Sequence, residues 1–196
     1  MARTVNPLKH EARRLQIIDA GLTCFAAHGY DGATTALICR TAGIGSGTFF
    51  HYFPTKRSLL LGILELGVAE SRDWFAGRPD DEDPLAVLDA YVAQAVADYA
   101  DPRVAGFIRA VGAVMTQPDV AAALAEDERV RAAGLLPWVA RAQSLGQIRG
   151  DLPPDRLVEW IVLLVDGFAV RMTESTGFDA QLEAAVLPDA VRRLLA

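Results

Sequence analysis

The sequence predicts an all-α fold of about nine helices, and three observations support this prediction. In almost every segment, apolar residues recur at steps of three and four positions, which places them on one face of a helix. No segment shows the alternation of apolar and polar residues that is typical of a half-buried strand. Prolines and glycines stand mainly between the periodic segments, where helices begin and end. The 196 residues, of which 52% are hydrophobic, suffice for one or two domains with a substantial core.

The first two helices are expected close to the N-terminus. Residues 11–28 have helical periodicity, and Gly29 is expected to close this helix in the left-handed conformation. Thr34 and Thr35 offer an N-cap for a short helix over residues 36–42, because a hydroxyl oxygen can accept a hydrogen bond from a free backbone N–H. Gly43 is expected to end that helix.

Two more helices are expected before the clearest break in the chain. A short helix fits residues 46–53, and Pro54 stops it. Thr55 then caps a longer helix that extends to about Phe75. Residues 77–84, with two prolines and four acids, indicate a solvated connection.

Five further helices are expected beyond this connection, over residues 85–99, 103–116, 119–145, 154–176 and 180–195. Prolines stand at several of their starts, where the missing N–H costs no hydrogen bond. Pro137 falls inside the long segment and predicts a kink or break there. The most apolar stretch, residues 160–165, is far shorter than the roughly 20 residues of a membrane helix. We therefore expect a soluble cytoplasmic protein without a membrane partner.

Charge is unevenly distributed along the chain. Residues 1–57 contain seven basic and three acidic residues, which is a formal charge of +4, and all three histidines. The remaining residues contain twelve basic and twenty-two acidic residues, which is −10 and gives the total of −6. A basic head on an acidic body is typical of a DNA-reading module joined to a domain that does not bind DNA. Cys24 and Cys39 have no metal-ligand spacing, so we expect two buried thiols, no metal site and no cofactor.

Residues 35–53 fit a helix-turn-helix. Gly43 stands where the turn needs a positive φ, which glycine adopts without steric cost. The small Cys39 allows the two helices to cross closely. Ile44, Phe49 and Phe53 can then point inward and pack the short helices onto the first one.

The outward side of the third helix is then small and polar at its leading end. Such an end can approach DNA closely, and its free N–H groups favour a negatively charged partner. Thr35 and Lys56, each at a helix N-terminus, are placed to contact phosphates. The residues on or near this outer face are Gly45, Ser46, Gly47, Thr48, Phe50 and His51.

About residues 12–61 resemble the N-terminal signature of the TetR family of transcriptional regulators. The resemblance is carried by the Ala-Gly-Ile of residues 42–44 and, above all, by the Gly-Thr-Phe-Phe-His-Tyr-Phe-Pro-Thr-Lys of residues 47–56. Gly29-Tyr30, Thr34-Thr35 and Ile38 agree with it in register. The rest of the chain resembles the family in length, helical content and the position of its last two helices.

The resemblance implies a homodimeric, ligand-responsive repressor that binds a palindromic DNA operator and releases it when a small-molecule effector binds. A DNA-binding domain would span residues 8–55, and a helical ligand-binding and dimerisation domain residues 56–196. Thr35 and Lys56 would hold phosphates. The recognition helix would carry Ser46, Gly47, Thr48, Phe50, His51 and Tyr52.

Two positions depart from the family pattern, and two residues have alternative roles. Gly45 replaces the serine that commonly caps the recognition helix, and Phe50 replaces a common tyrosine. Phe50 can offer DNA only an apolar face, for instance to a thymine methyl group. Tyr52 fits a core position as well as a DNA contact, and His51 could be an ordinary surface histidine.

The body must dimerise if an operator is read in two half-sites. Residues 155–172 are apolar on more than one face, so one face can pack inside the subunit and the other against a partner. With the last helix they could form a four-helix bundle across a two-fold axis. A monomer whose core uses both faces is the alternative. The expected interface residues are Trp160, Leu164, Phe168, Val186 and Leu194.

An effector pocket is harder to locate, because each candidate fits an ordinary core position equally well. Arg109, Arg141 and Arg171 lie beside apolar faces and could pair with an anionic ligand or with nearby acids. The expected pocket residues are Phe107, Met115, Trp138 and Phe168, within a wider set that adds Tyr91, Tyr99, Val111, Trp160 and Met172.

Other functions are weighed against this interpretation. An enzyme needs converging reactive groups, yet the body has no histidine after His51 and no nucleophile elbow, phosphate-binding loop or zinc-protease motif. We therefore expect no catalytic residues. An activator would use the same head, and an all-α small-molecule carrier would lack the DNA function.

Overall fold

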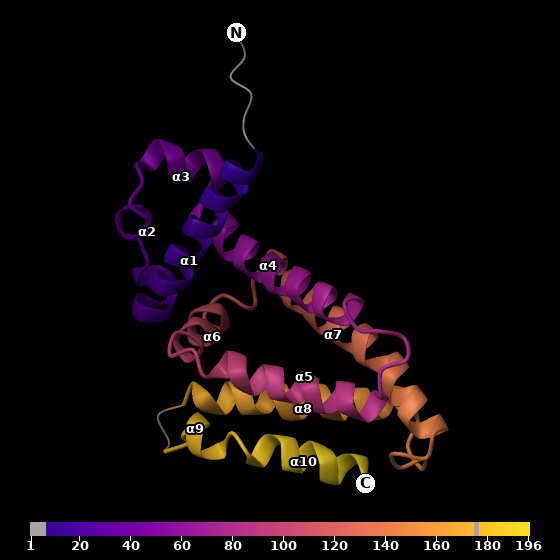
Figure 1. Ribbon diagram of the computed structural model, residues 1–196. Coiled ribbons are helices and arrows are strands. Elements are labelled where there is room, and N and C mark those ends of the chain that lie inside the picture. The colour runs from indigo at the N-terminus through magenta and orange to yellow at the C-terminus, as the bar shows by residue number, and fades with distance from the viewer. Residues whose placement is uncertain (1–6, 175–176) are drawn as a thin grey trace.

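The computed structural model describes residues 7–174 and 177–196, and within these ranges it contains ten α-helices and no strand (Figure 1). The predicted all-α fold is therefore confirmed. The helix predicted over residues 154–176 ends earlier, at Met172, and position 176 itself lies outside the described residues. The helices are α1 (Pro7–Gly32), α2 (Thr35–Thr41), α3 (Ser46–Tyr52), α4 (Lys56–Ala76), α5 (Pro84–Tyr99), α6 (Val104–Gly112), α7 (Pro118–Ser144), α8 (Pro154–Met172), α9 (Ala180–Glu183) and α10 (Val186–Leu195).

The predicted N-caps of α2 and α4 are confirmed. Gly29 has the expected positive φ of +68°, but its ψ of 176° is not left-handed helical, and it kinks α1, which continues to Gly32, instead of closing it. Thr34 accepts a hydrogen bond from the Leu37 N–H (3.2 Å) at the start of α2. Thr55 caps α4, where its hydroxyl and that of Ser58 each accept a backbone N–H of the other residue (3.0 and 2.9 Å). Each cap satisfies a donor that the helix itself leaves free.

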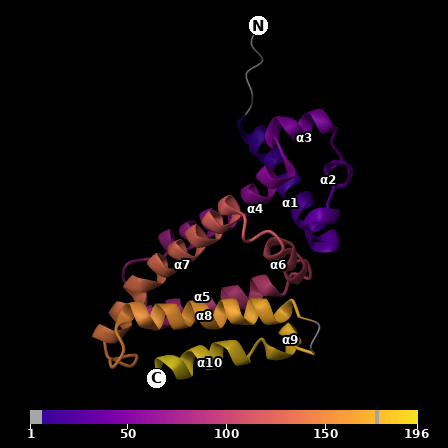
Figure 2. The ribbon, with the colours of Figure 1, turned by 180° about the vertical axis from the view of Figure 1, so that it is seen from behind.

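Helices α1, α2 and α3 lie together at one end of the molecule, and α4 leads away from them (Figure 1). The same arrangement is visible from behind, where α5, α8 and α10 run side by side at the opposite end (Figure 2). The long helix α7 packs against α4, α5 and α8 and so connects the layers of the body.

Two hydrophobic cores hold the fold. The first joins buried residues of α1 to α4 with Ala110 and Val111 of α6 and Val120 of α7. The second joins α5, α8 and α10 with the C-terminal half of α7. The predicted domain boundary after residue 55 falls inside the first core, which includes Leu59 and Leu60 of α4, and it stays a prediction.

Several helices differ from the sequence prediction. Helix α1 is longer than the predicted residues 11–28, and α6 ends at Gly112 instead of residue 116. Of the kink or break predicted at Pro137, the break does not occur, since α7 continues through it and packs against α4, α5 and α8. The predicted helix over residues 180–195 is divided into α9 and α10 by a turn. This division puts Pro188 in the first turn of α10, where a residue without an N–H loses no helical hydrogen bond.

Candidate nucleic-acid interface and body cavity

The turn between α2 and α3 has the expected geometry. Gly43 has φ +63°, and the two helices meet over the buried residues Ile38 and Cys39. Phe49 and Phe53 are 0% and 4% exposed, which confirms that they point into the core. These inward aromatic side chains pack the seven-residue α3 onto the rest of the head.

The opposite face of α3 is exposed and unusually slim. Ser46, Gly47, Thr48 and His51 are all exposed, and the Phe50 ring is 52% exposed. A Cβ atom built at Gly47 would meet no other atom within 4 Å, so packing inside the chain does not require glycine there. The N-cap Gly45 makes no side-chain hydrogen bond to the helix. The leading end of α3 is therefore open to a close approach from outside.

Tyr52 and His51 take different positions at the end of α3. The Tyr52 ring is half-buried and lies 4.5 Å from the His10 ring of α1, centroid to centroid. The exposed His51 ring lies 5.2 Å from Tyr52 and 6.2 Å from His10. Tyr52 therefore positions α3 on α1, whereas His51 remains accessible. Sequence analysis missed His10, because its neighbours in this cluster lie some forty residues further along the chain.

Lys56 is held at the junction of α1 and α4. Its Nζ donates to the Tyr30 carbonyl oxygen (2.5 Å) and lies 4.3 Å from the centroid of the Tyr30 ring. The Asp31 carbonyl is a further acceptor at 3.4 Å. Thr35, the first residue of α2, is half-buried. The Lys56 ammonium is thus fixed beside the helix-turn-helix instead of extending freely into solvent.

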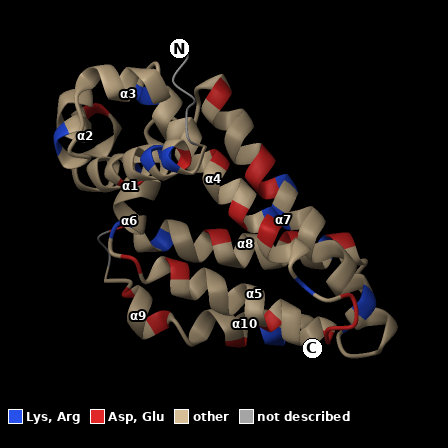
Figure 3. Cartoon of the chain, turned by 45° about the horizontal axis from the view of Figure 1, so that its top comes forward, with Lys and Arg blue, Asp and Glu red and all other residues tan. Residues whose placement is uncertain are grey.

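The charge asymmetry of the sequence persists in space. In Figure 3 the positions of basic residues are coloured along α1 and α2, and most positions of acidic residues lie along the other helices and the connection between α4 and α5. An exposed, slim helix end on the more basic side of the molecule suits a polyanionic partner.

A cavity of about 1270 Å³ opens between α4, α5, α6, α7 and α8. Met115 lines it, and so do Tyr91, Tyr99 and Val111 of the wider candidate set, whose binding of a ligand stays a prediction. Phe107, Trp138 and Phe168 are not among its lining residues. Phe107 packs against the first core and Trp138 against the second.

Phe168 belongs to the second core. Its side chain is 8% exposed, and its ring stacks on Tyr99 (5.8 Å between centroids) and meets Phe178 edge-on (5.1 Å). Phe168 thus supports the cavity from behind through Tyr99. Arg109 lines the cavity, but Arg141 and Arg171 do not.

A charged cluster that sequence analysis missed forms one wall of the cavity. Arg131 donates to Asp127 (2.8 Å) and, through two nitrogens, to Asp166 (2.8 and 3.2 Å). Its side chain is 16% exposed. Burial alone would lower the pKa of Arg131, but the Asp166 carboxylate outweighs this effect and keeps the pKa above its ordinary value.

Burial raises the pKa values of the Tyr91 and Tyr99 phenols, so both stay neutral at physiological pH. The Asp127–Arg131 spacing of four residues on a helix was the signal available in the sequence.

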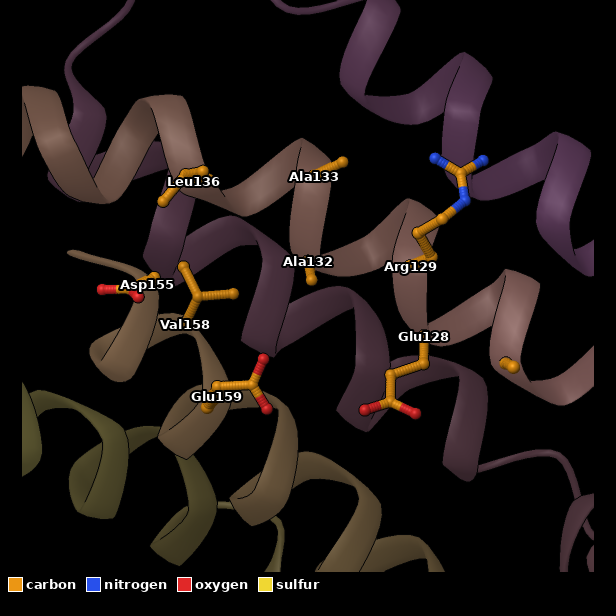
Figure 4. Close-up of a pocket in the computed structure, with 9 residues that line it drawn as sticks. Glu128, Arg129, Ala132, Ala133, Leu136, Asp155, Val158 and Glu159 are labelled. Atoms are coloured by element: carbon orange, nitrogen blue, oxygen red, sulfur yellow. The ribbon is translucent and has the colours of Figure 1, made fainter.

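A smaller groove of about 420 Å³ lies between α7 and α8 (Figure 4). Ala132 and Val158 line its apolar part, and Glu128 and Glu159 bring carboxylates to its edge. Arg129 points away from α8 and pairs with Glu126 (2.7 Å).

Apolar side chains are also exposed along α8, α9 and α10. Among the predicted interface residues, Trp160 is 45% and Val186 54% exposed, Leu164 and Leu194 are partly buried, and Phe168 is buried. The exposed apolar residues that the prediction missed on these helices are Leu163, Val170 and Leu182. None of the helices in residues 7–174 and 177–196 combines the length and apolar character that crossing a lipid bilayer requires.

Known proteins are similar to this chain in both sequence and fold. Residues 17–63 match the family described as bacterial regulatory proteins, tetR family. An HTH-type transcriptional repressor of Mycobacterium tuberculosis, Rv1474c, is 30% identical over 93% of this chain and 94% of its own length. The repressor AcnR of Corynebacterium diphtheriae is 28% identical over 85% and 84%.

Solved structures extend the likeness to the complete fold. A TetR transcription regulator from Haloarcula marismortui superposes with a TM-score of 0.79 at 16% identity, covering 94% of this chain and 97% of the other. GusR of Salmonella enterica superposes with a TM-score of 0.73 at 22% identity, covering 98% of each chain. With its exposed α3, its helical body and relatives of matching length, the chain belongs to the TetR family of DNA-binding transcriptional regulators.

Proposed function

We propose that this protein is a homodimeric repressor that binds a palindromic operator through α3 and releases it when a small organic effector enters the body cavity. The observation that carries the proposal is the face of α3. Its Gly47 has no packing role inside the chain, and the side chains of Ser46, Thr48, Phe50 and His51 are exposed beside it. This arrangement suits the floor and walls of a DNA major groove. A chromosomal operator would place the protein in the cytoplasm.

Contacts to the DNA divide into two kinds in this proposal. Thr35 and Lys56 flank α3 and hold phosphates, which fixes the position of the helix but carries no sequence information. The Tyr30 carbonyl that binds Lys56 Nζ limits the positions available to the ammonium. Phe50 and His51 face base edges, where an apolar ring favours a thymine methyl group.

The exposed apolar face of α8, α9 and α10 supports the dimer. Trp160, Leu163 and Val186 are each at least 45% exposed, so these large apolar side chains are available to a partner. Packing α8 and α10 against the same helices of a second copy makes an isologous interface. Two α3 helices could then enter successive major grooves, roughly 34–36 Å apart.

Helix α6 supplies a physical link between cavity and head. Its residues Val104, Ile108 and Val111 line the cavity, and the same helix packs against α1. At Gly106 the two backbones approach so closely that a Cβ atom would overlap the Ala26 carbonyl. Arg103, just before α6, donates to Asp19 (2.7 Å) and Thr23 (3.2 Å) of α1. An effector that moves α6 would therefore also move α1, and with it the spacing between the two α3 helices of the dimer.

Selection of genomic DNA fragments by the purified protein tests the proposal. We expect enrichment of fragments that contain an inverted repeat whose half-site centres are about 10 base pairs, or a multiple of this, apart. Footprinting at about 50 mM salt should protect both half-sites. Recovery of no common sequence, with no footprint on any selected fragment, would contradict the proposal. A reporter gene behind the selected operator then distinguishes repression from activation.

A further inference from the structure

The cavity wall carries an excess of negative charge. Five of its lining residues are acidic, namely Glu70, Asp98, Asp127, Glu128 and Asp166, and two are basic. The two basic residues are Arg109 and Arg131, so the formal charge of the wall is −3. Arg131 is paired with two of the carboxylates, those of Asp127 and Asp166. The cavity therefore disfavours an anionic ligand, although Arg109 could in principle have served one.

Three wall carboxylates form no ion pair among the described residues, namely Glu70 of α4, Asp98 of α5 and Glu128 of α7, and the first two repel each other. Asp98 accepts a hydrogen bond from the neutral amide of Gln94 (2.8 Å). Neither Glu70 nor Asp98 forms a salt bridge with a basic side chain of the described residues. Burial, and then the negative charge of Asp98, raise the pKa of the Glu70 carboxyl. Two carboxylates that repel each other gain free energy when a positive charge binds between them.

The apolar part of the wall is aromatic. Trp74 and Tyr91 line the cavity together with Tyr99, which is backed by Phe168. Trp74 and Tyr91 meet edge-on with 6.1 Å between their ring centroids. The faces of aromatic rings attract cations, and their area favours an apolar ligand body. The Trp74 ring already attracts one cation, since the Arg78 guanidinium lies 4.0 Å from its centroid.

The size of the cavity and its ligand atoms argue for an organic ion rather than a metal ion. The volume of about 1270 Å³ exceeds the roughly 300–1,000 Å³ of typical small-molecule sites and so leaves room for a whole organic molecule. Within residues 7–174 and 177–196, no three His, Cys, Asp or Glu side chains are arranged to hold a metal ion. We infer that the effector is an organic cation, whose positive centre lies between Glu70 and Asp98 and whose apolar body lies against Trp74, Tyr91 and Tyr99. This inference rests on the proposed function, because it takes the cavity as the effector site.

Two ions of the same shape and opposite charge test the inference. Tetraphenylphosphonium is a cation and tetraphenylborate is its anionic isostere, so their comparison isolates charge from size and apolar area. Isothermal titration calorimetry with the full chain at about 0.15 M salt should give an affinity for the cation at least roughly tenfold higher than for the anion. Equal affinities, a preference for the anion, or no binding of the cation would overturn the inference.

Variants of the wall carboxylates test which negative charges cause the preference for the cation. The double variant Glu70→Gln, Asp98→Asn should bind tetraphenylphosphonium about tenfold more weakly, because it loses the two carboxylates assigned to the positive centre. The matched control is Glu65→Gln, Asp73→Asn, which removes the same charge from exposed positions of α4 that do not line the cavity. The control should keep the cation preference to within about twofold. Equal losses in the two double variants, or no loss in either, would contradict the assigned position.

A DNA measurement separates this inference from the proposed function. The unmodified chain is assayed on its selected operator with and without each ion. Release of DNA by the cation alone supports both statements. Operator binding that persists in both ions, in a chain that also fails to bind the cation, overturns the cationic effector but leaves the DNA-binding function intact. If no operator can be selected, the proposed function fails whatever the calorimetry shows.

Discussion

The outward face of α3 and the wall of the cavity are both open to a ligand, but they are built in opposite ways. The face of α3 comes from seven consecutive residues and presents small or uncharged side chains around Phe50 and His51. The cavity wall is assembled from five helices and presents carboxylates and aromatic rings. A surface made by one short helix moves as a unit and keeps its pattern. A surface shared by five helices changes whenever one helix shifts, which is a useful property in a sensor.

The DNA-binding role of the α3 face is tested most strongly by the variant Gly47→Glu. We expect at least about a hundredfold loss of operator affinity, because the glutamate would put a bulky negative charge against the DNA backbone. The fold should persist, since a Cβ atom at this position meets nothing within 4 Å. Gly150→Glu is the matched control, because Gly150 is exposed, has the same free space around it and lies in the loop before α8. Electrophoretic mobility shifts measure affinity, and far-ultraviolet circular dichroism measures helix content. Normal operator binding by the Gly47 variant would show that α3 does not face the DNA.

The contact between α1 and α6, which links the α3 face to the cavity, is tested by the variant Gly106→Ala. The added methyl group would overlap the Ala26 carbonyl, so α1 and α6 must separate. Overpacking of this kind costs about 1–3 kcal/mol of unfolding free energy. Gly112→Ala at the end of the same helix has free space and should cost little. Urea denaturation compares the two variants. Equal stability would show that the α1–α6 contact is not tightly packed in solution.

A smaller effect is expected from Lys56→Ala. The variant should lose one phosphate contact, which weakens binding to all DNA sequences alike and lowers the slope of log affinity against log salt by about 1. It should also lose some stability, because Lys56 Nζ binds the Tyr30 carbonyl. Fluorescence anisotropy on specific and random duplexes at several salt concentrations measures both slopes. A loss confined to the specific duplex would instead assign Lys56 to base reading.

The smallest effect is expected from Glu70→Gln on the stability of the unliganded protein. The folded-state pKa of Glu70 is raised, so the proton binds more tightly to the folded chain, and the resulting stabilisation is present at low pH and lost as pH rises through the folded-state pKa. The glutamine variant should therefore be slightly more stable at pH 7, by a few tenths of a kcal/mol at this largely exposed site, and should match the unmodified chain at pH 3. Thermal melts at the two pH values check this. A destabilised variant at pH 7 would show that Glu70 has a favourable partner.

The sequence predicted α1–α4 well because their signals are local. Thr34, Gly43 and Thr55 act on groups within a few residues, so each cap could be located without the fold. The contact of Lys56 with the Tyr30 carbonyl joins residues 26 positions apart. The helical periodicity of the sequence cannot predict such a contact. Pro137 predicted a kink or a break, and the break is absent from α7, which packs against three other helices along its length.

Most of the residues that line the cavity could not be predicted from the sequence, for a related physical reason. Aromatic residues such as Trp138 and Phe168 satisfy helical periodicity whether they line a cavity or fill a core. Only the packing of α4, α5, α6, α7 and α8 decides which of them face the open space. Charged wall residues such as Glu70 and Asp98 look like ordinary solvent-exposed positions until those helices are assembled.

The first hydrophobic core has a consequence for protein engineering. It joins α1–α4 to Ala110 of α6 and Val120 of α7, and α6 touches the backbone of α1 at Ala26. A hybrid regulator that takes its head from a relative by splicing after residue 55 would cut through this core. Its new head would meet an unfamiliar α6 and lose both packing and the link to the cavity. A functional hybrid should instead be made by transplanting the residues of α6 that contact α1 together with the head, so that the two surfaces remain matched.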